Sequence, residues 1–67
     1  MYIVIELQTA ADGTVANLVY AYQTLNEAYN RYYLILASAA VSELPCHGAV
    51  IVRNTCDPVV FSHFIHE

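Results

Sequence analysis

Apolar residues recur at every second position along residues 2–9 and again along residues 15–22. This period of two is typical of a strand with one face against a core. Asp12 and Gly13 separate the two stretches, and an Asp-Gly pair between alternating runs is a strong hairpin signal. The pattern therefore predicts two antiparallel neighbouring strands, residues 2–9 and 15–22, joined by a tight turn.

The centre of the chain changes to a helical period. Thr24 and Glu27 have the spacing of a capping box, which predicts that a helix begins at Leu25. Pro45 disfavours helical geometry in the residue before it, so we expect the helix to end near residues 42–43. One apolar stripe follows this helix, formed by Leu25, Ala28, Tyr29, Tyr32, Leu36, Ala39 and Ala40.

Four more apolar residues of the helix are expected to point away from this stripe: Tyr33, Leu34, Ile35 and Ala37. A helix that is hydrophobic nearly all round is buried on more than one side. A chain of 67 residues has too little material to bury such a helix alone. We therefore expect the chain to assemble with other copies of itself.

Two further strands are predicted after the helix. Residues 49–53 are apolar and β-branched, residues 59–65 alternate again, and residues 54–58 between them have turn composition. The order of two strands, one helix and two strands predicts an α+β fold of ββαββ type. Its four-stranded, mainly antiparallel sheet carries the helix across one face. The whole chain, residues 1–67, is expected to form one domain whose second sheet face meets another copy.

The composition agrees with assembly, because 58% of the residues are hydrophobic and only 12% are charged, against a usual charged share of about 25%. No apolar run reaches the roughly 18 residues of a membrane span, and no secretion signal is recognisable. We therefore expect a cytoplasmic protein without a membrane partner.

The net charge of −4, with Arg31 and Arg53 as the only Lys or Arg residues, argues against binding of DNA or RNA.

Six tyrosines are present among the 67 residues. Tyrosine is enriched at interfaces, so these side chains either fill the core and a subunit interface or stack on a planar ligand such as a nucleobase. An arginine can hold the phosphate of such a ligand, and a symmetric oligomer brings two or more copies of it to the axis. The predicted ligand-binding residues are Arg53 and Arg31 for phosphate, Tyr33, Tyr32 and Tyr22 for stacking, and His47 as a polar contact.

Cysteine and histidine are residue types that bind zinc, but Cys46, His47, Cys56, His63 and His66 lack the spacing of a known zinc motif. We predict no metal and no other cofactor.

Either cysteine could act as a nucleophile with His63 as base, but nothing in the sequence brings them within reach, so no catalytic residue is predicted. The cysteine count permits a disulfide, whereas a cytosolic chain keeps its thiols reduced. His47 is expected to cap a backbone carbonyl or to line an interface.

The segments MYIVIELQT, DGTV, NEA and LASAAVSELPCHGAV resemble a family of short uncharacterised proteins from phages and prophages of gut Firmicutes. The likeness covers about residues 1–52. Family members have an aliphatic residue at the position of Cys46, whereas His47 matches. The resemblance implies a phage-encoded protein in the host cytoplasm, and it carries no established activity.

Small oligomeric phage proteins include non-enzymatic inhibitors that sequester the cyclic nucleotide signals of bacterial immunity. We therefore hypothesise a non-enzymatic, homo-oligomeric binding protein that sequesters a cyclic oligonucleotide, because the chain combines many tyrosines, an expected subunit interface and two arginines. One alternative is a structural or accessory phage assembly protein. Another is an inhibitor whose acidic exterior covers a basic site on a host protein.

Overall fold

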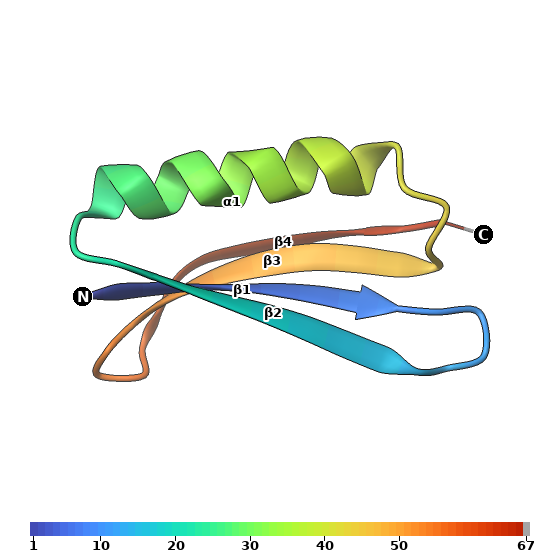
Figure 1. Ribbon diagram of the computed structural model, residues 1–67, viewed down its shortest axis with the longest axis horizontal. Helices are drawn as coiled ribbons and strands as arrows, with labels where there is room; N and C mark the ends of the chain where they lie inside the picture. Colours follow the sequence, from blue (N-terminus) through green and yellow to red (C-terminus); the bar gives the residue numbers. More distant parts are fainter. Residues whose placement is uncertain (67) are drawn as a thin grey trace.

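The computed structural model describes residues 1–66, and in it one helix lies across one face of a four-stranded sheet (Figure 1). The elements in chain order are β1 (Tyr2–Thr9), β2 (Val15–Tyr22), α1 (Leu25–Ala40), β3 (Cys46–Arg53) and β4 (Pro58–Ile65). The strand order is β2-β1-β3-β4, and all three pairings are antiparallel. The predicted ββαββ architecture is confirmed. Within residues 1–66 no helix is long and apolar enough to cross a membrane.

The first hairpin has the predicted boundaries, and its strands pair without interruption from Tyr2↔Tyr22 to Thr9↔Val15. Gly13 adopts a φ of +89°, in the left-handed region that glycine enters without steric cost. The Oδ1 atom of Asp12 accepts a hydrogen bond from the backbone N–H of Thr14 at 2.9 Å. The Asp-Gly signal therefore identified the turn through local chemistry.

Helix α1 begins where the capping box predicts. The Thr24 hydroxyl oxygen accepts from the N–H of Glu27 at 3.3 Å, and the hydroxyl donates to the Glu27 carboxylate at 2.8 Å. The helix ends at Ala40, earlier than the expected residues 42–43. Its last turn closes with 3.3 and 3.2 Å bonds from the N–H groups of Val41 and Ser42 to carbonyls three residues back. These bonds satisfy carbonyls that the helix leaves free, and the chain then turns toward β3.

The hydrophobic core lies between α1 and the two central strands, because α1 contacts β3 and β1 more than it contacts the edge strands. Its buried residues are Val4, Ala28, Tyr32, Ile35, Ala49 and Ile51. Ile35 was expected outside the stripe and is only 4% exposed, whereas Ala40 was expected inside and is exposed. The buried positions on α1 follow steps of four, three and four residues, so the inward face is rotated slightly from the predicted stripe.

Strand β3 begins at Cys46, three residues before the predicted start, because residues 46–48 pair with the end of β1. Glycine is required at position 48 because the neighbouring strand β4 approaches its backbone closely. A Cβ at this position would lie 2.5 Å from the Ser62 carbonyl oxygen and 2.5 Å from the Cβ of His63. Strand β4 begins at Pro58, and its register with β3 shifts between Ile51 and Val52.

The turn between β3 and β4 places Cys56 in the left-handed region, with a φ of 74°. The N–H of Cys56 donates to the carbonyl of Arg53 at 2.8 Å. Cys46 and Cys56 are free and lie at opposite ends of β3, about 23 Å apart for an extended strand of this length. A disulfide needs Cα atoms within about 7 Å, so the two cysteines of one chain do not pair.

Candidate functional site

The two faces of the sheet differ in how they are covered. Residues on one face lie under α1, whereas the other face has no element over it (Figure 1). We call the second face the open face. It consists of Ile3, Ile5, Leu7, Thr9, Val15, Asn17, Val19, Ala21, Cys46, Gly48, Val50, Val52, Phe61, His63 and Ile65. None of these fifteen residues is Asp, Glu or Arg.

The open face exposes large apolar side chains. Val15, Val19, Phe61 and Ile65 are 62–71% exposed. Single exposed apolar residues are common, but a contiguous apolar surface on a small chain marks an interaction site.

A shallow hollow of about 340 Å³ lies on the open face around Gly48. Gly48 contributes no side chain, and Cys46 and His63 are among the residues at the rim. The structure thus brings one of the two cysteines near His63. Among the described residues no hydrogen bond joins them, and residues 1–66 contain no group of three or more side chains suited to a metal ion. The lining, which includes Leu7, Val50 and Phe61, suits an apolar side chain.

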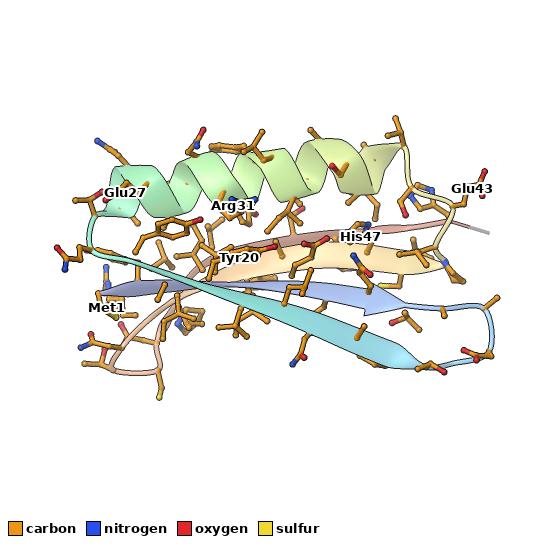
Figure 2. All side chains as sticks on the ribbon, viewed as in Figure 1. Met1, Tyr20, Glu27, Arg31, Glu43 and His47 are labelled. Atoms are coloured by element: carbon orange, nitrogen blue, oxygen red, sulfur yellow. The ribbon has the colours of Figure 1, made fainter. Side chains whose placement is uncertain are left out.

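An arginine–tyrosine cluster lies on the opposite side of the sheet, between α1 and β2. The Nε–H of Arg31 donates to the Tyr22 hydroxyl at 3.0 Å. The guanidinium carbon of Arg31 lies 4.5 Å from the centre of the Tyr20 ring, which is a cation–π contact. The hydrogen bond to Tyr22 raises the pKa of Arg31 above its already high ordinary value. Figure 2 shows Arg31 on α1 above Tyr20.

This cluster is accessible because α1 leaves β2 largely uncovered. On the helix side of β2, Ala16 and Leu18 are exposed, and Tyr20 and Tyr22 are half-buried. We call these four residues the β2 shelf. Among the described residues, no protein group accepts a hydrogen bond from the two terminal amino groups of Arg31. The β2 shelf and Arg31 therefore offer aromatic surface and free donors side by side.

A buried polar cluster lies farther under α1. Glu6 is 9% exposed and His47 is 4% exposed. His47 Nε2 and Glu6 Oε2 are 2.6 Å apart, and the side-chain amide of Gln8 donates to the same oxygen at 2.9 Å. The Nδ1 atom of His47 is buried without a hydrogen-bond partner. A carboxylate–imidazole pair can move protons, but both members of this pair are buried.

The predicted site residues do not form one site. Tyr32 belongs to the core at 3% exposed, and burial raises the pKa of its phenol, so its ring offers no surface for stacking. His47 bonds Glu6 and not a backbone carbonyl, which corrects that expectation. Tyr33 is 61% exposed on the outer side of α1. Its ring stacks on that of Tyr29, with centroids 5.8 Å apart.

Arg53 lies at the end of β3 and donates to the carboxylate of Asp57 at 3.0 Å. The Thr55 hydroxyl and Arg53 together hold the pKa of Asp57 below its usual range. Of the six predicted residues the structure brings together Arg31 with Tyr22, and Tyr32 with Tyr33, whose ring centroids are 5.4 Å apart. Only the first pair joins an arginine to an aromatic ring, and the structure adds Tyr20 to it. The period of two in β2 places Tyr20 and Tyr22 on one face, and this signal was available in the sequence.

Comparison with known protein families, curated proteins and solved structures finds no match to this chain. The resemblance to phage proteins stays a prediction.

Proposed function

We propose that this protein is a non-enzymatic, homo-oligomeric binding protein whose copies meet through the open face. The observation that supports this proposal is the run of fifteen residues across four strands without an Asp, Glu or Arg. A sheet normally covers such a face with a second layer. Among residues 1–66 the one helix lies on the other side of the sheet, and we take a second copy of the chain to be the layer that covers the open face.

The size of the open face suits this role. Four strands of eight residues span about 19 by 26 Å, or about 500 Å² of flat surface per copy. Two copies together contribute about 1,000 Å² before the relief of the side chains is counted, and specific interfaces bury about 1,200–2,000 Å². Two such sheets pack face to face at a spacing of about 10 Å.

Replacing Leu7 with lysine tests this interface. Leu7 is 44% exposed on a central strand, so a lysine there is tolerated in a single copy but is buried when two faces meet. We expect Leu7→Lys to give a smaller particle than the wild type by light scattering. The matched control is Val41→Lys, because Val41 is 83% exposed at the end of α1. An unchanged particle size for Leu7→Lys would contradict assembly through this face.

We further propose that the ligand is a small phosphate-bearing molecule with planar rings, of the cyclic oligonucleotide class. Arg31 presents free donors for a phosphate, and the β2 shelf presents aromatic rings for stacking. The charge of Glu6 contributes to the raised pKa of Arg31 after the larger effect of the hydrogen bond to Tyr22, and the Glu6 carboxylate is itself bound by His47 and Gln8. The resemblance of residues 1–52 to phage proteins favours sequestration of an immune signal as the biological role.

Thermal denaturation against a panel of cyclic di- and trinucleotides tests the ligand. A nucleotide at 100 times its dissociation constant stabilises the folded protein by about 2.7 kcal/mol. Recovery of intact nucleotide after denaturation supports sequestration, whereas conversion of the nucleotide would contradict a non-enzymatic role.

The two arginines of the chain provide a matched pair of variants. Arg31→Gln is expected to abolish the thermal shift. Arg53→Gln is expected to keep it, because Arg53 already pairs with Asp57. If no nucleotide shifts the transition of a folded oligomer, the ligand is wrong and assembly remains as the function.

A further inference from the structure

The two edges of the sheet are protected to different degrees. Natural edge strands are usually blunted with lysine, proline, bulges or short length, because their free N–H and C=O groups otherwise pair with another strand. Strand β2 has eight residues, VANLVYAY, with no charge and no proline, and its register with β1 is continuous. It therefore carries none of these protections.

Strand β4, at the opposite edge, is protected. It begins with Pro58, which has no N–H to donate, and its register with β3 is irregular between Ile51 and Val52. Such irregularities twist an edge away from a regular partner. The sheet thus has one closed edge and one edge that is open to a partner strand.

We propose that β2 pairs with β2 of a second copy, antiparallel and about a two-fold axis, to form a continuous eight-stranded sheet. This inference rests on the proposed function, because it specifies where the ligand of the arginine–tyrosine cluster is held. A second copy suits the edge since β2 has no charge that would meet its own image. Pairing about a two-fold axis perpendicular to the sheet keeps both helices on the same side.

The register of this pairing is restricted. Residues that lie opposite each other in an antiparallel pair point to the same face. The axis must therefore pass midway between a residue and its own copy, and Leu18 or Val19 at the middle of β2 gives the longest overlap. Either choice places the two β2 shelves next to each other on the helix side of the sheet, between the two helices.

The geometry produces a trough. Helix α1 lies over β1 and β3, so two helices in the eight-stranded sheet are separated by four strand spacings, or about 19 Å between axes. Helices with side chains are about 10 Å wide, which leaves a gap of about 9 Å. The floor of the gap is the pair of β2 strands, and Arg31 of each copy lies on a wall.

The occupant that this trough fits is a symmetric molecule with two phosphates and two planar rings, such as a cyclic dinucleotide. The clusters of Arg31, Tyr20 and Tyr22 of the two copies lie on either side of the axis, and each cluster contacts one half of the molecule. A single chain offers one arginine beside a half-exposed shelf, so the site is incomplete without the second copy. The stoichiometry is then one nucleotide for two chains.

Disulfide trapping tests the pairing without any ligand. In a background of Cys46→Ser and Cys56→Ser, the variants Leu18→Cys and Val19→Cys test the two possible positions of the axis. The variant at the axis places two thiols directly opposite each other, within reach of a disulfide. The control is Leu34→Cys on the outer side of α1, because Leu18, Val19 and Leu34 are 50%, 62% and 53% exposed. We expect one of the two variants to cross-link at least tenfold faster than the control under mild oxidation. Rates equal to the control for both variants would overturn the pairing.

Titration calorimetry with cyclic di-AMP and cyclic di-GMP tests the shared site, with AMP as the one-phosphate control. We expect 0.5 nucleotide per chain and at least tenfold tighter binding of one cyclic dinucleotide than of AMP. One nucleotide per chain would overturn the shared trough and leave the proposed ligand in place. Binding of neither dinucleotide would overturn the shared trough together with this ligand.

Charged variants separate this inference from the proposed function. Leu18→Glu places two like charges beside the axis and near the phosphates, so it is expected to weaken nucleotide binding at least tenfold and to leave the open face free to associate. Leu7→Lys acts on the other side of the sheet. If Leu7→Lys reduces the particle size while neither Leu18→Cys nor Val19→Cys cross-links, the β2 pairing fails and assembly through the open face stands.

Discussion

Replacing His47 with leucine removes one partner of the buried Glu6–His47 pair. The side chains of His47 and Glu6 are only 6% and 11% exposed, so water screens their interaction very little. Breaking a buried pair costs about 3–5 kcal/mol, because the remaining group stays buried without its partner. Gln8 still donates to Glu6, which places the expected loss for His47→Leu at the lower end, about 3 kcal/mol.

Replacing both partners should cost much less than this. Two leucines remove both members of the buried pair and leave only the half-buried Gln8 amide without its acceptor, and exchanges of a buried pair for apolar residues are often neutral or stabilising. We therefore expect the double variant Glu6→Leu/His47→Leu to unfold within about 1 kcal/mol of the wild type, which implies a coupling free energy of several kcal/mol. Glu6→Gln keeps an acceptor for His47 and exchanges a charge-assisted hydrogen bond for a neutral one, so it should cost about 1 kcal/mol.

Urea denaturation followed by circular dichroism measures these differences. All variants must be compared at one protein concentration, because association adds to the apparent stability. A small domain is stable by about 5–15 kcal/mol, so the single variant should still fold. The reasoning is refuted if the free energy of unfolding of His47→Leu lies within 1 kcal/mol of the wild type. It is also refuted if the effects of the single variants Glu6→Leu and His47→Leu add up to the effect of the double variant, without coupling.

Three further predictions concern local structure. Thr24→Ala removes the side-chain cap of α1 and should lower the free energy of unfolding by about 1 kcal/mol, measured by urea denaturation. Cys56→Gly should raise it by about 0.5–1 kcal/mol, because glycine adopts the left-handed φ of 74° without a Cβ clash; Cys56→Ala, the control, should change it little. Burial raises the folded-state pKa of Tyr32 above its unfolded value. The contribution of Tyr32 to the free energy of unfolding is therefore full below about pH 10 and is lost as the pH rises through the folded-state pKa. Because phenylalanine does not ionise, the melting temperature of Tyr32→Phe should fall less at alkaline pH than that of the wild type.

The boundaries that the sequence predicted correctly depend on local chemistry. Gly13 and Asp12 define the first turn, and Thr24 with Glu27 defines the start of α1. Each of these signals acts within four residues along the chain, so it does not depend on what the rest of the fold does. The boundaries that were wrong depend on tertiary contacts. Strand β3 starts at Cys46 because β1 is long enough to pair there.

The phase of a helix and the inward face of a strand are also tertiary properties. Alternation in β1 showed that Ile3 and Ile5 share one face and that Val4 and Glu6 share the other. It did not show which face lies under α1. The partner that satisfies Glu6 is His47, 41 residues farther along the chain, so no window around β1 contains the answer.

The candidate site was predictable only in part, because the sequence shows residue type but does not show which side chains are buried. Arg31 and Tyr22 were identified by residue type, because arginine and tyrosine are the side chains that bind phosphate and planar rings. Tyr32 and His47 were placed in the same set, although both are buried. Their burial depends on where α1 crosses the sheet, and residue type does not contain that information.

The buried pair and the open face are consequences of the same orientation of β1. A shift of one residue in the pairing would turn every side chain of the strand to the other face. Ile3 and Ile5 would then lie in the core, and Glu6 would lie on the open face, where it would keep a second copy away. The bond between Glu6 and His47 opposes this shift, because the shifted register would bury neither group beside its partner. The pair of Glu6 and His47 therefore keeps the apolar residues of β1, such as Ile3 and Ile5, on the open face. A sheet with such a face is stable in water when a second copy covers it.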